Sequence, residues 1–174
     1  MTSVQALAPA EPIEERHFRD VLGLFATGVV AVTAIDTEGR PAGMTANSFT
    51  AVSLRPPLVS FCVAHTSTTW PRLRTAGRCA VSILAEHQRE VCLRLAAHGG
   101  DKFGGLAWTP SPAGQPVLAG AIGWLDCVLE AEHWAGDHVI VLCRVSALDL
   151  SDDGQPLVFY RGGYGGFRGA RPCP

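Results

Sequence analysis

A stretch of small, uncharged residues, followed by a double proline and an apolar run, limits the folds open to this chain. It reads G-M-T-A-N-S-F-T-A-V-S-L-R-P-P-L-V-S-F-C-V from Gly43 to Val63. Proline fixes φ and removes a backbone donor, so Arg55-Pro56-Pro57 predicts a corner between two strands. Small residues also let a backbone lie close to a flat ligand, and hydroxyl and amide groups offer it uncharged hydrogen bonds. From the residues alone, a plain pair of strands and the wall of a ligand site remain equal alternatives.

The composition excludes several classes of protein. A length of 174 residues corresponds to one domain with a sizeable core. Apolar residues make up 47% of the chain and charged residues only 17%, which excludes a disordered chain. The low charge leaves few polar side chains to cover the surface, so we expect an oligomer. The net charge of −2 indicates neither nucleic acid nor an anionic membrane as a partner.

The cysteines and histidines indicate neither a secreted protein nor a metal site. None of the six cysteines forms a C-x-x-C pair, and most lie in apolar runs as small hydrophobic residues. Their even number permits disulfides, but residues 1–12 lack the basic and apolar regions of a secretory signal. No apolar run is long enough to span a bilayer. We therefore expect a cytoplasmic protein with reduced thiols and, because the histidines are scattered, no metal.

The order of patterns along the chain predicts a mainly β protein with added helices. We expect a flexible tail over residues 1–16, one domain over 17–167 and a second tail over 168–174. Helices are expected at 18–25, from Ser67-Thr68-Thr69 to Gly77, and at 86–97. Strands are expected at 29–35, 58–64, 79–84, 124–130, 139–145 and 157–160. Loops are expected at 98–105 and 109–116. Many strands without regular βαβ alternation favour a β-barrel.

The usual nucleotide and hydrolase motifs are missing from the sequence. It contains no Walker A motif and no G-x-S-x-G, and Arg168 stands where the G-Y-G-G-F-R segment would need its last glycine to complete G-x-G-x-x-G. Ser67-Thr68-Thr69 could bind a phosphate at a helix start or could be an ordinary N-cap. Lys102 in a glycine-rich loop could reach a phosphate or lie in solvent. His138 could donate to a substrate carbonyl or bond its neighbour in a turn. Residues 161–164 contain one cation and an aromatic ring beside two glycines. They could contact a ligand near a glycine hinge, or they could be the end of a strand.

Together, these segments resemble one family, the short flavin reductases, which are the small components of two-component flavin-dependent monooxygenases. The matching segments are F-A-T-G-V-V-A-V-T from Phe25, the stretch from Gly43 to Val63, S-T-T-W-P-R-L from Ser67, A-V-S-I-L-A from Ala80, D-K-F from Asp101, W-L-D-C from Trp124, A-G-D-H from Ala135 and P-L-V-F-Y-R-G-G-Y from Pro156. Their order and spacing carry the resemblance, which spans residues 18–164.

The resemblance implies a split β-barrel of the Greek-key, FMN-binding type, usually assembled as a homodimer. It also implies hydride transfer from NADH or NADPH to FAD or FMN, and release of the reduced flavin to a separate monooxygenase. Carried onto this sequence, it gives Thr45, Ala46, Asn47, Ser48, Phe49, Thr50, Ser60, Phe61 and Cys62 along the flavin ring, Thr27, Gly28, Val29 and Val30 close by, Ser67, Thr68, Thr69, Trp70, Lys102 and Phe103 around the phosphate, and His138 and Tyr164 on the nicotinamide side.

His138 is the one residue for which we expect a part in catalysis, as a group that orients the nicotinamide without supplying a proton. No basic residue clearly reads a 2′-phosphate, which favours NADH over NADPH. Two other functions remain open at this point: an oxidase that keeps FMN tightly bound on a similar barrel, and a flavin-binding module without enzyme activity.

Overall fold

The computed structural model describes residues 12–151 and 154–168. The helices are α1 (Glu15–Leu22), α2 (Trp70–Ala76) and α3 (Arg89–Ala96), with a 3-10 turn η1 (Glu86–Gln88) before α3. The strands are β1 (Thr27–Gly28), β2 (Val30–Ile35), β3 (Pro41–Ala46), β4 (Thr50–Leu54), β5 (Pro57–Ala64), β6 (Arg78–Ile83), β7 (Trp108–Pro110), β8 (Pro116–Leu118), β9 (Gly123–Ala135), β10 (His138–Leu150), β11 (Leu157–Tyr160) and β12 (Gly163–Gly166). The chain is therefore mainly β with added helices, as predicted.

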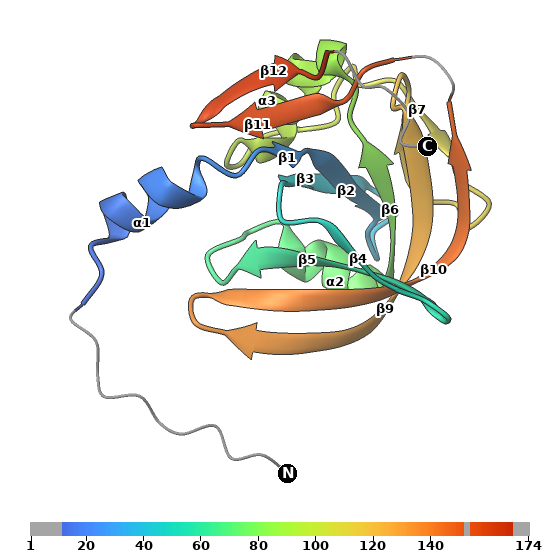
Figure 1. The fold of residues 1–174 in the computed structure, drawn as a ribbon. Helices are drawn as coiled ribbons and strands as arrows, with labels where there is room; N and C mark the ends of the chain where they lie inside the picture. Colours follow the sequence, from blue (N-terminus) through green and yellow to red (C-terminus); the bar gives the residue numbers. More distant parts are fainter. Residues whose placement is uncertain (1–11, 152–153, 169–174) are drawn as a thin grey trace.

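A seven-stranded antiparallel sheet forms the body of the molecule. Its strand order is β3-β2-β6-β9-β10-β5-β4, so β3 and β4 form its two edges although they are neighbours in sequence. The sheet curls around its core, and the long β9–β10 hairpin crosses one end (Figure 1). A smaller sheet, β1-β11-β12, lies beside α3 at the other end. The curl brings the edge strand β3 back toward β5, and this places the site described below.

Strand β2 is apolar except for Thr33, because both of its faces are buried; the Thr33 hydroxyl is buried too and donates to the Pro116 carbonyl. Val30, Val32 and Ala34 point into the main core with Phe61 and other residues of the large sheet. Ala31, on the opposite face, packs in a second cluster with residues of α3 and β11. Side chains alternate between the two faces of a strand, so a continuous apolar run is expected for a strand that is covered on both sides.

Strand β5 alternates between buried and half-exposed residues. Val59, Phe61 and Val63 are buried, whereas the intervening residues are half-exposed. The strand predicted at 58–64 is therefore present, and it is buried on one face only. Phe61 is fully buried and meets the Trp70 ring edge-to-face, with a centroid separation of 5.7 Å. One face of β5 thus belongs to the core and the other is available to a ligand.

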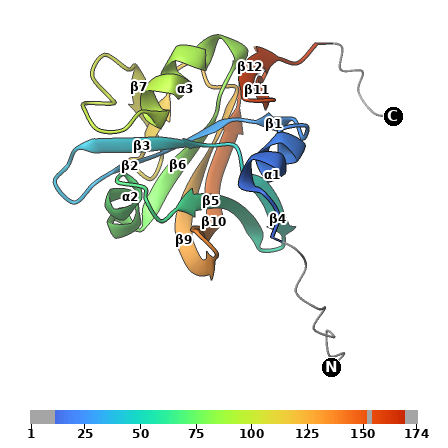
Figure 2. The ribbon, with the colours of Figure 1, turned by 90° about the vertical axis from the view of Figure 1, so that its left-hand side faces the viewer.

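Helix α1 stands apart from the core. The predicted apolar spacing does form a helix, but the helix begins at Glu15, within the predicted tail, and ends at Leu22. None of its residues is buried, and Phe18, Val21 and Leu22 are each at least 50% exposed. Figures 1 and 2 show α1 projecting from the barrel on the side of β1 and β4.

Several other boundaries differ from the predictions. The predicted 86–97 helix opens with η1 and becomes α-helical only at Arg89, and Ala96, expected on its inner face, is exposed. The 109–116 segment, predicted as a loop, begins and ends in the short paired strands β7 and β8. Strands β9 and β10 have 13 residues each because their pairing continues through two register irregularities. Gly77 ends α2 in the left-handed conformation, as expected.

The five described cysteines are thiols, and four of them are buried, as predicted for small hydrophobic residues; Cys173 and the C-terminal tail from 169 lie outside the described residues. Among the helices of the described chain, none is long and apolar enough to cross a bilayer.

Candidate functional site

A pocket of about 430 Å³ lies where β3 approaches β5, and we call it the seam pocket. Its walls come from the end of β3, the end of β5, the segment before α2, the end of α3, Lys102 and the start of β10. The predicted site residues that line it are Thr45, Ala46, Asn47, Ser48, Cys62, Ser67, Thr68, Thr69, Lys102 and His138. The fold therefore gathers segments that are far apart in the sequence into one pocket.

The β3–β4 connection is fixed against β5 by a side chain. The Ser48 hydroxyl accepts a hydrogen bond from the Cys62 N–H at 2.8 Å. It also lies 3.4 Å from the Cys62 carbonyl oxygen, to which it can donate. This contact continues the strand ladder beyond β4 and holds Asn47 exposed beside the pocket. The small, uncharged residues of this connection thus form a fixed polar wall.

Lys102 lies on the opposite wall from a loop that follows α3. Its ammonium donates to the Thr69 hydroxyl at 3.1 Å and to the Leu95 carbonyl at 2.9 Å. Burial lowers the pKa of Lys102, and the nearby charge of Arg72 lowers it further. Both hydrogen-bond partners are neutral, so the lysine presents an uncompensated positive charge that an anionic ligand group would stabilise.

His138 is the first residue of β10, opposite Ala64 of β5. Its Nδ1 lies 2.7 Å from the Asp137 carboxylate, which fixes the ring at the pocket mouth and lowers the pKa of Asp137. His138 therefore does bond its neighbour, as one of the two predicted alternatives has it, and it also lines the seam pocket. Trp134, on the same hairpin, is 80% exposed and stacks on His65.

The start of α2 supports both predicted alternatives for its hydroxyl residues. The Ser67 hydroxyl accepts the Trp70 N–H at 3.1 Å and so satisfies one free backbone donor at the helix start, while Thr69, at the N-cap position, makes no side-chain cap. Thr68 and Thr69 line the seam pocket beside it. The side chain of Trp70 packs in the core and its indole N–H donates to Glu132, so this ring does not reach the pocket.

The remaining predicted site residues do not line the seam pocket, and their roles stay predictions; Phe103 lines the cavity next to it, described below. The side chains of Val29, Val30, Phe61 and Phe103 are buried in the two core clusters, Phe49 packs against the main core, and Gly28, Thr50 and Ser60 are not among the residues of the pocket wall. The Tyr164 ring packs at a tilt against Phe159, with a centroid separation of 5.2 Å, beside the second cluster, where burial raises the pKa of Tyr164 to about 12. Tyr164 and His138 are therefore not brought to one place.

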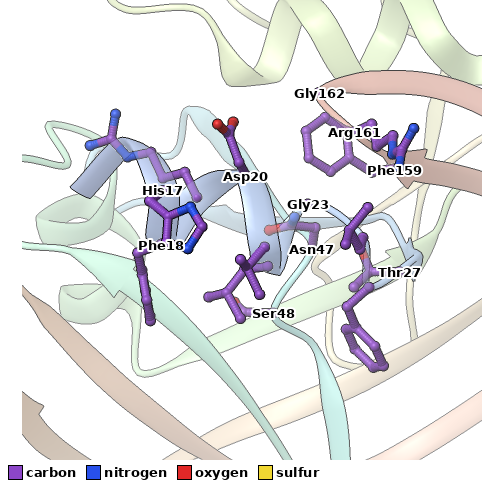
Figure 3. A pocket seen from close by; sticks show the side chains of 15 residues that line it. His17, Phe18, Asp20, Gly23, Thr27, Asn47, Ser48, Phe159, Arg161 and Gly162 are labelled. Atoms are coloured by element: carbon purple, nitrogen blue, oxygen red, sulfur yellow. The ribbon is translucent and has the colours of Figure 1, made fainter. Parts of the chain in front are cut away.

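Two further cavities adjoin the seam pocket. The first, about 1070 Å³, is apolar and lies between α1 and the turn after β11. Figure 3 shows side chains of α1 on one side of it and Phe159 and Arg161 on the other, with Asn47 and Ser48 between them. Thr27 also lines it, and its hydroxyl is buried without a partner among the described residues. Asn47 and Ser48 line both this cavity and the seam pocket.

The second cavity, about 720 Å³, runs from the seam pocket along Thr68, Thr69 and Lys102. We call it the arginine groove because Arg40 and Arg72 line it. Sequence reasoning assigned no role to Arg72, or to Leu95, Ala97 and His98 of the seam pocket. No motif marks these residues, since only the folded chain brings α2, the end of α3 and the 99–104 loop together.

Comparison with known proteins decides which family this arrangement belongs to. Residues 22–168 match the sequence model of the flavin reductase like domain. A flavin reductase from Pseudomonas putida is 46% identical over 167 residues, which cover 96% of this chain and 98% of that protein. The chain belongs to the flavin reductase family.

Solved structures agree with this assignment. A homologue of nitrilotriacetate monooxygenase component B from Mycobacterium thermoresistibile is 40% identical, with a TM-score of 0.88 over 92% of this chain and 91% of that one. An NADH:FAD oxidoreductase from Streptomyces globisporus, in complex with NAD and FAD fragments, is 35% identical, with a TM-score of 0.81 over 95% and 98% of the two chains. The predicted family, split-barrel fold and flavin reductase function are thereby confirmed.

The residues of the seam pocket fit a flavin, the group that the family implies. Hydroxyl and amide groups from Thr45, Asn47 and Ser48 offer uncharged hydrogen bonds on one wall, and Lys102 offers a positive charge on another. A flavin with a phosphate needs both kinds of group. The pocket volume also falls in the usual range for sites of small-molecule ligands.

Proposed function

We propose that this flavin reductase oxidises NADH, reduces FAD or FMN held in the seam pocket, and passes the reduced flavin to a separate monooxygenase. The observation that carries the proposal is the meeting of the polar 45–48 wall, Lys102 and His138 in one pocket of a flavin reductase fold. When bound, the flavin supplies the chemistry by accepting a hydride from the reduced nicotinamide. The protein binds and orients the two ligands.

Each wall of the pocket has its own part in this proposal. Thr45, Asn47 and Ser48 bind the polar edge of the flavin ring, and Lys102 with the Thr69 hydroxyl binds its phosphate. His138, held by Asp137, orients the nicotinamide at the mouth. The resemblance to an NADH:FAD oxidoreductase supports NADH as the donor. The resemblance to a monooxygenase component supports an oxygenase as the partner.

Anaerobic assays of the purified protein test this function. NADH and NADPH are supplied separately, each with FAD, FMN or riboflavin. We expect NADH to bleach the yellow colour of the free flavin faster than NADPH does. Colour that persists with both donors would refute reductase activity, and yellow protein that survives dialysis and ignores added flavin would indicate a tight FMN oxidase instead.

His138→Ala is expected to raise the KM for NADH about three- to tenfold, with a smaller change in the KM for flavin, because it removes one hydrogen-bonding group from the nicotinamide side. Steady-state kinetics with each substrate varied in turn measures both constants. His87→Ala is the control, since His87 is exposed and lies outside the seam pocket. An unchanged KM for NADH would remove this role from His138.

We also infer that the protein is a homodimer in which the apolar side of α1 is covered by the second copy. An eight-residue helix is marginal on its own, and Leu24 and Phe25 directly after it are 51% and 75% exposed. Sedimentation should give twice the chain mass of 18.4 kDa. The double variant Leu22→Glu/Phe25→Glu should sediment as a monomer, whereas Arg19→Glu on the exposed polar side should not. A wild-type monomer at micromolar concentration would contradict this inference.

A further inference from the structure

The arginine groove contains two cationic side chains, Arg40 and Arg72, that do not line the seam pocket. Three cationic side chains line it, Arg40, Arg72 and Lys102, against the single carboxylate of Asp101. That carboxylate is already engaged, since one of its oxygens accepts the N–H groups of Phe103 and Gly104 at 3.0 Å each. The two arginines are paired with carboxylates, Arg40 with Glu38 at 2.6 Å and Arg72 with Asp36 at 2.7 Å. The Lys102 ammonium, whose hydrogen-bond partners are neutral, and the guanidinium N–H groups of Arg72 that Asp36 leaves free are therefore the groups that the groove offers to an anion.

Arg72 is held in place by a buried acid. Its Nε and Nη2 donate to one oxygen of Asp36 at 3.0 and 2.7 Å. The other oxygen of Asp36 accepts the N–H groups of Glu38 and Arg40 at 3.0 and 2.9 Å. Asp36 is only 8% exposed, and these backbone hydrogen bonds, with Arg72, lower its pKa to about 2. Asp36 is therefore ionised at neutral pH and fixes the guanidinium at the groove.

The groove also offers an aromatic surface and direct access from the seam pocket. Trp108 lines it and is half-buried, and an indole ring can stack on a purine. Thr68, Thr69 and Lys102 line both cavities, so a ligand phosphate beside Lys102 would lie at their junction. A ligand that extends beyond this phosphate would enter the groove with its next phosphate facing Arg72.

We propose that the arginine groove binds the adenosine diphosphate half of FAD, and that Arg72, positioned by Asp36, contacts the phosphate that FMN lacks. The proposal rests on the proposed function of the seam pocket. It makes FAD the preferred flavin and Arg72 a specificity-determining residue. NADH carries the same adenosine diphosphate group, but the junction at Lys102 connects the groove to the flavin phosphate and not to His138.

Equilibrium binding of FAD and FMN to Arg72→Met tests the proposal without turnover. We expect the Kd for FAD to rise about tenfold, as for loss of one charge-assisted hydrogen bond, and the Kd for FMN to change less than twofold. Arg74→Met is the matched control: Arg74 lies on the same helix and pairs with Glu132 outside the groove, so its loss should change neither constant. Equal weakening of FAD and FMN by Arg72→Met, or no weakening of FAD, would overturn the proposal.

Two further experiments test whether the groove binds FAD or NADH, and whether Asp36 acts by positioning Arg72. With FMN as acceptor, Arg72→Met and wild type should have the same KM for NADH. A higher KM for NADH in the variant, without weaker FAD binding, would assign the groove to NADH and overturn the proposal. Asp36→Asn should also raise the Kd for FAD. If Asp36 acts only by positioning Arg72, the double variant Asp36→Asn/Arg72→Met should bind FAD as well as Arg72→Met does, whereas an independent structural loss at Asp36 would raise the Kd further. FAD binding that depends on Arg72 in a protein that reduces no flavin would support the groove and refute the proposed function.

Discussion

Replacing Lys102 with methionine will weaken FMN binding about 10- to 100-fold, because a hydrogen bond from a charged donor to a phosphate contributes roughly 1.5–3 kcal/mol. Methionine keeps the length and apolar stem of the side chain and removes only the ammonium. The folded protein should lose little stability, because the loss of the hydrogen bonds to Thr69 and Leu95 is offset by removal of a charge that burial disfavours, as the lowered pKa of Lys102 indicates. Titration calorimetry of wild type and variant measures the two Kd values.

Riboflavin provides the internal control for this variant, because it has the same ring and no phosphate. Its Kd should stay within about twofold of the wild-type value if Lys102 acts on the phosphate alone. Lys102→Arg keeps the charge and should retain most of the FMN affinity. If riboflavin weakens as much as FMN, Lys102 supports the shape of the pocket rather than the phosphate, and the assignment of its role is wrong.

Local residue patterns identified most of the strands and helices, because each depends on a short stretch of chain. The β-branched run of β2 and the glycine that ends α2 were recognisable without the fold. The polar stretch at 45–48 was visible too, but the residues alone fitted a plain pair of strands equally well, and only the family resemblance favoured a ligand wall. These features specify their own backbone and need no distant partner.

Features that depend on distant contacts could not be predicted. Arg72 and Asp36 are 36 positions apart, and nothing in either local sequence indicates that they meet. Lys102 reaches Thr69 across 33 positions. The length of β9 and β10 depends on their mutual pairing, and the exposure of α1 depends on what the rest of the barrel leaves uncovered. Such features follow only from the arrangement of the whole sheet.

The orientation of β5 is an intermediate case, and it bears on the predicted flavin contact of Phe61. Period-2 alternation identifies two faces of a strand but does not say which is inside when both carry apolar residues. Phe61 and Cys62 are adjacent and both apolar, and the resemblance placed both beside the flavin. In the fold, Phe61 is fully buried and Cys62 lines the seam pocket. The larger ring fills the core, and the smaller thiol leaves room for a ligand.

Phe61→Ala should therefore lower the free energy of unfolding by about 3–5 kcal/mol, the usual cost of removing a fully buried phenylalanine ring. The ring packs edge-to-face on Trp70, so its removal leaves a cavity between β5 and α2 that neither element can close without moving. Urea unfolding followed by circular dichroism measures the change. Leu54→Ala is the control, because Leu54 is 88% exposed and should change the free energy by no more than about 0.5 kcal/mol.

Phe61→Leu separates a core role for this residue from a ligand contact. Leucine refills most of the space, so the variant should be more stable than Phe61→Ala, and its Kd for FMN should match that of wild type because position 61 faces away from the pocket. A variant that folds normally but binds FMN many-fold more weakly would place the ring against the flavin after all. It would also mean that Phe61, and not Cys62, lies on the ligand side of β5, contrary to the contact between Ser48 and Cys62.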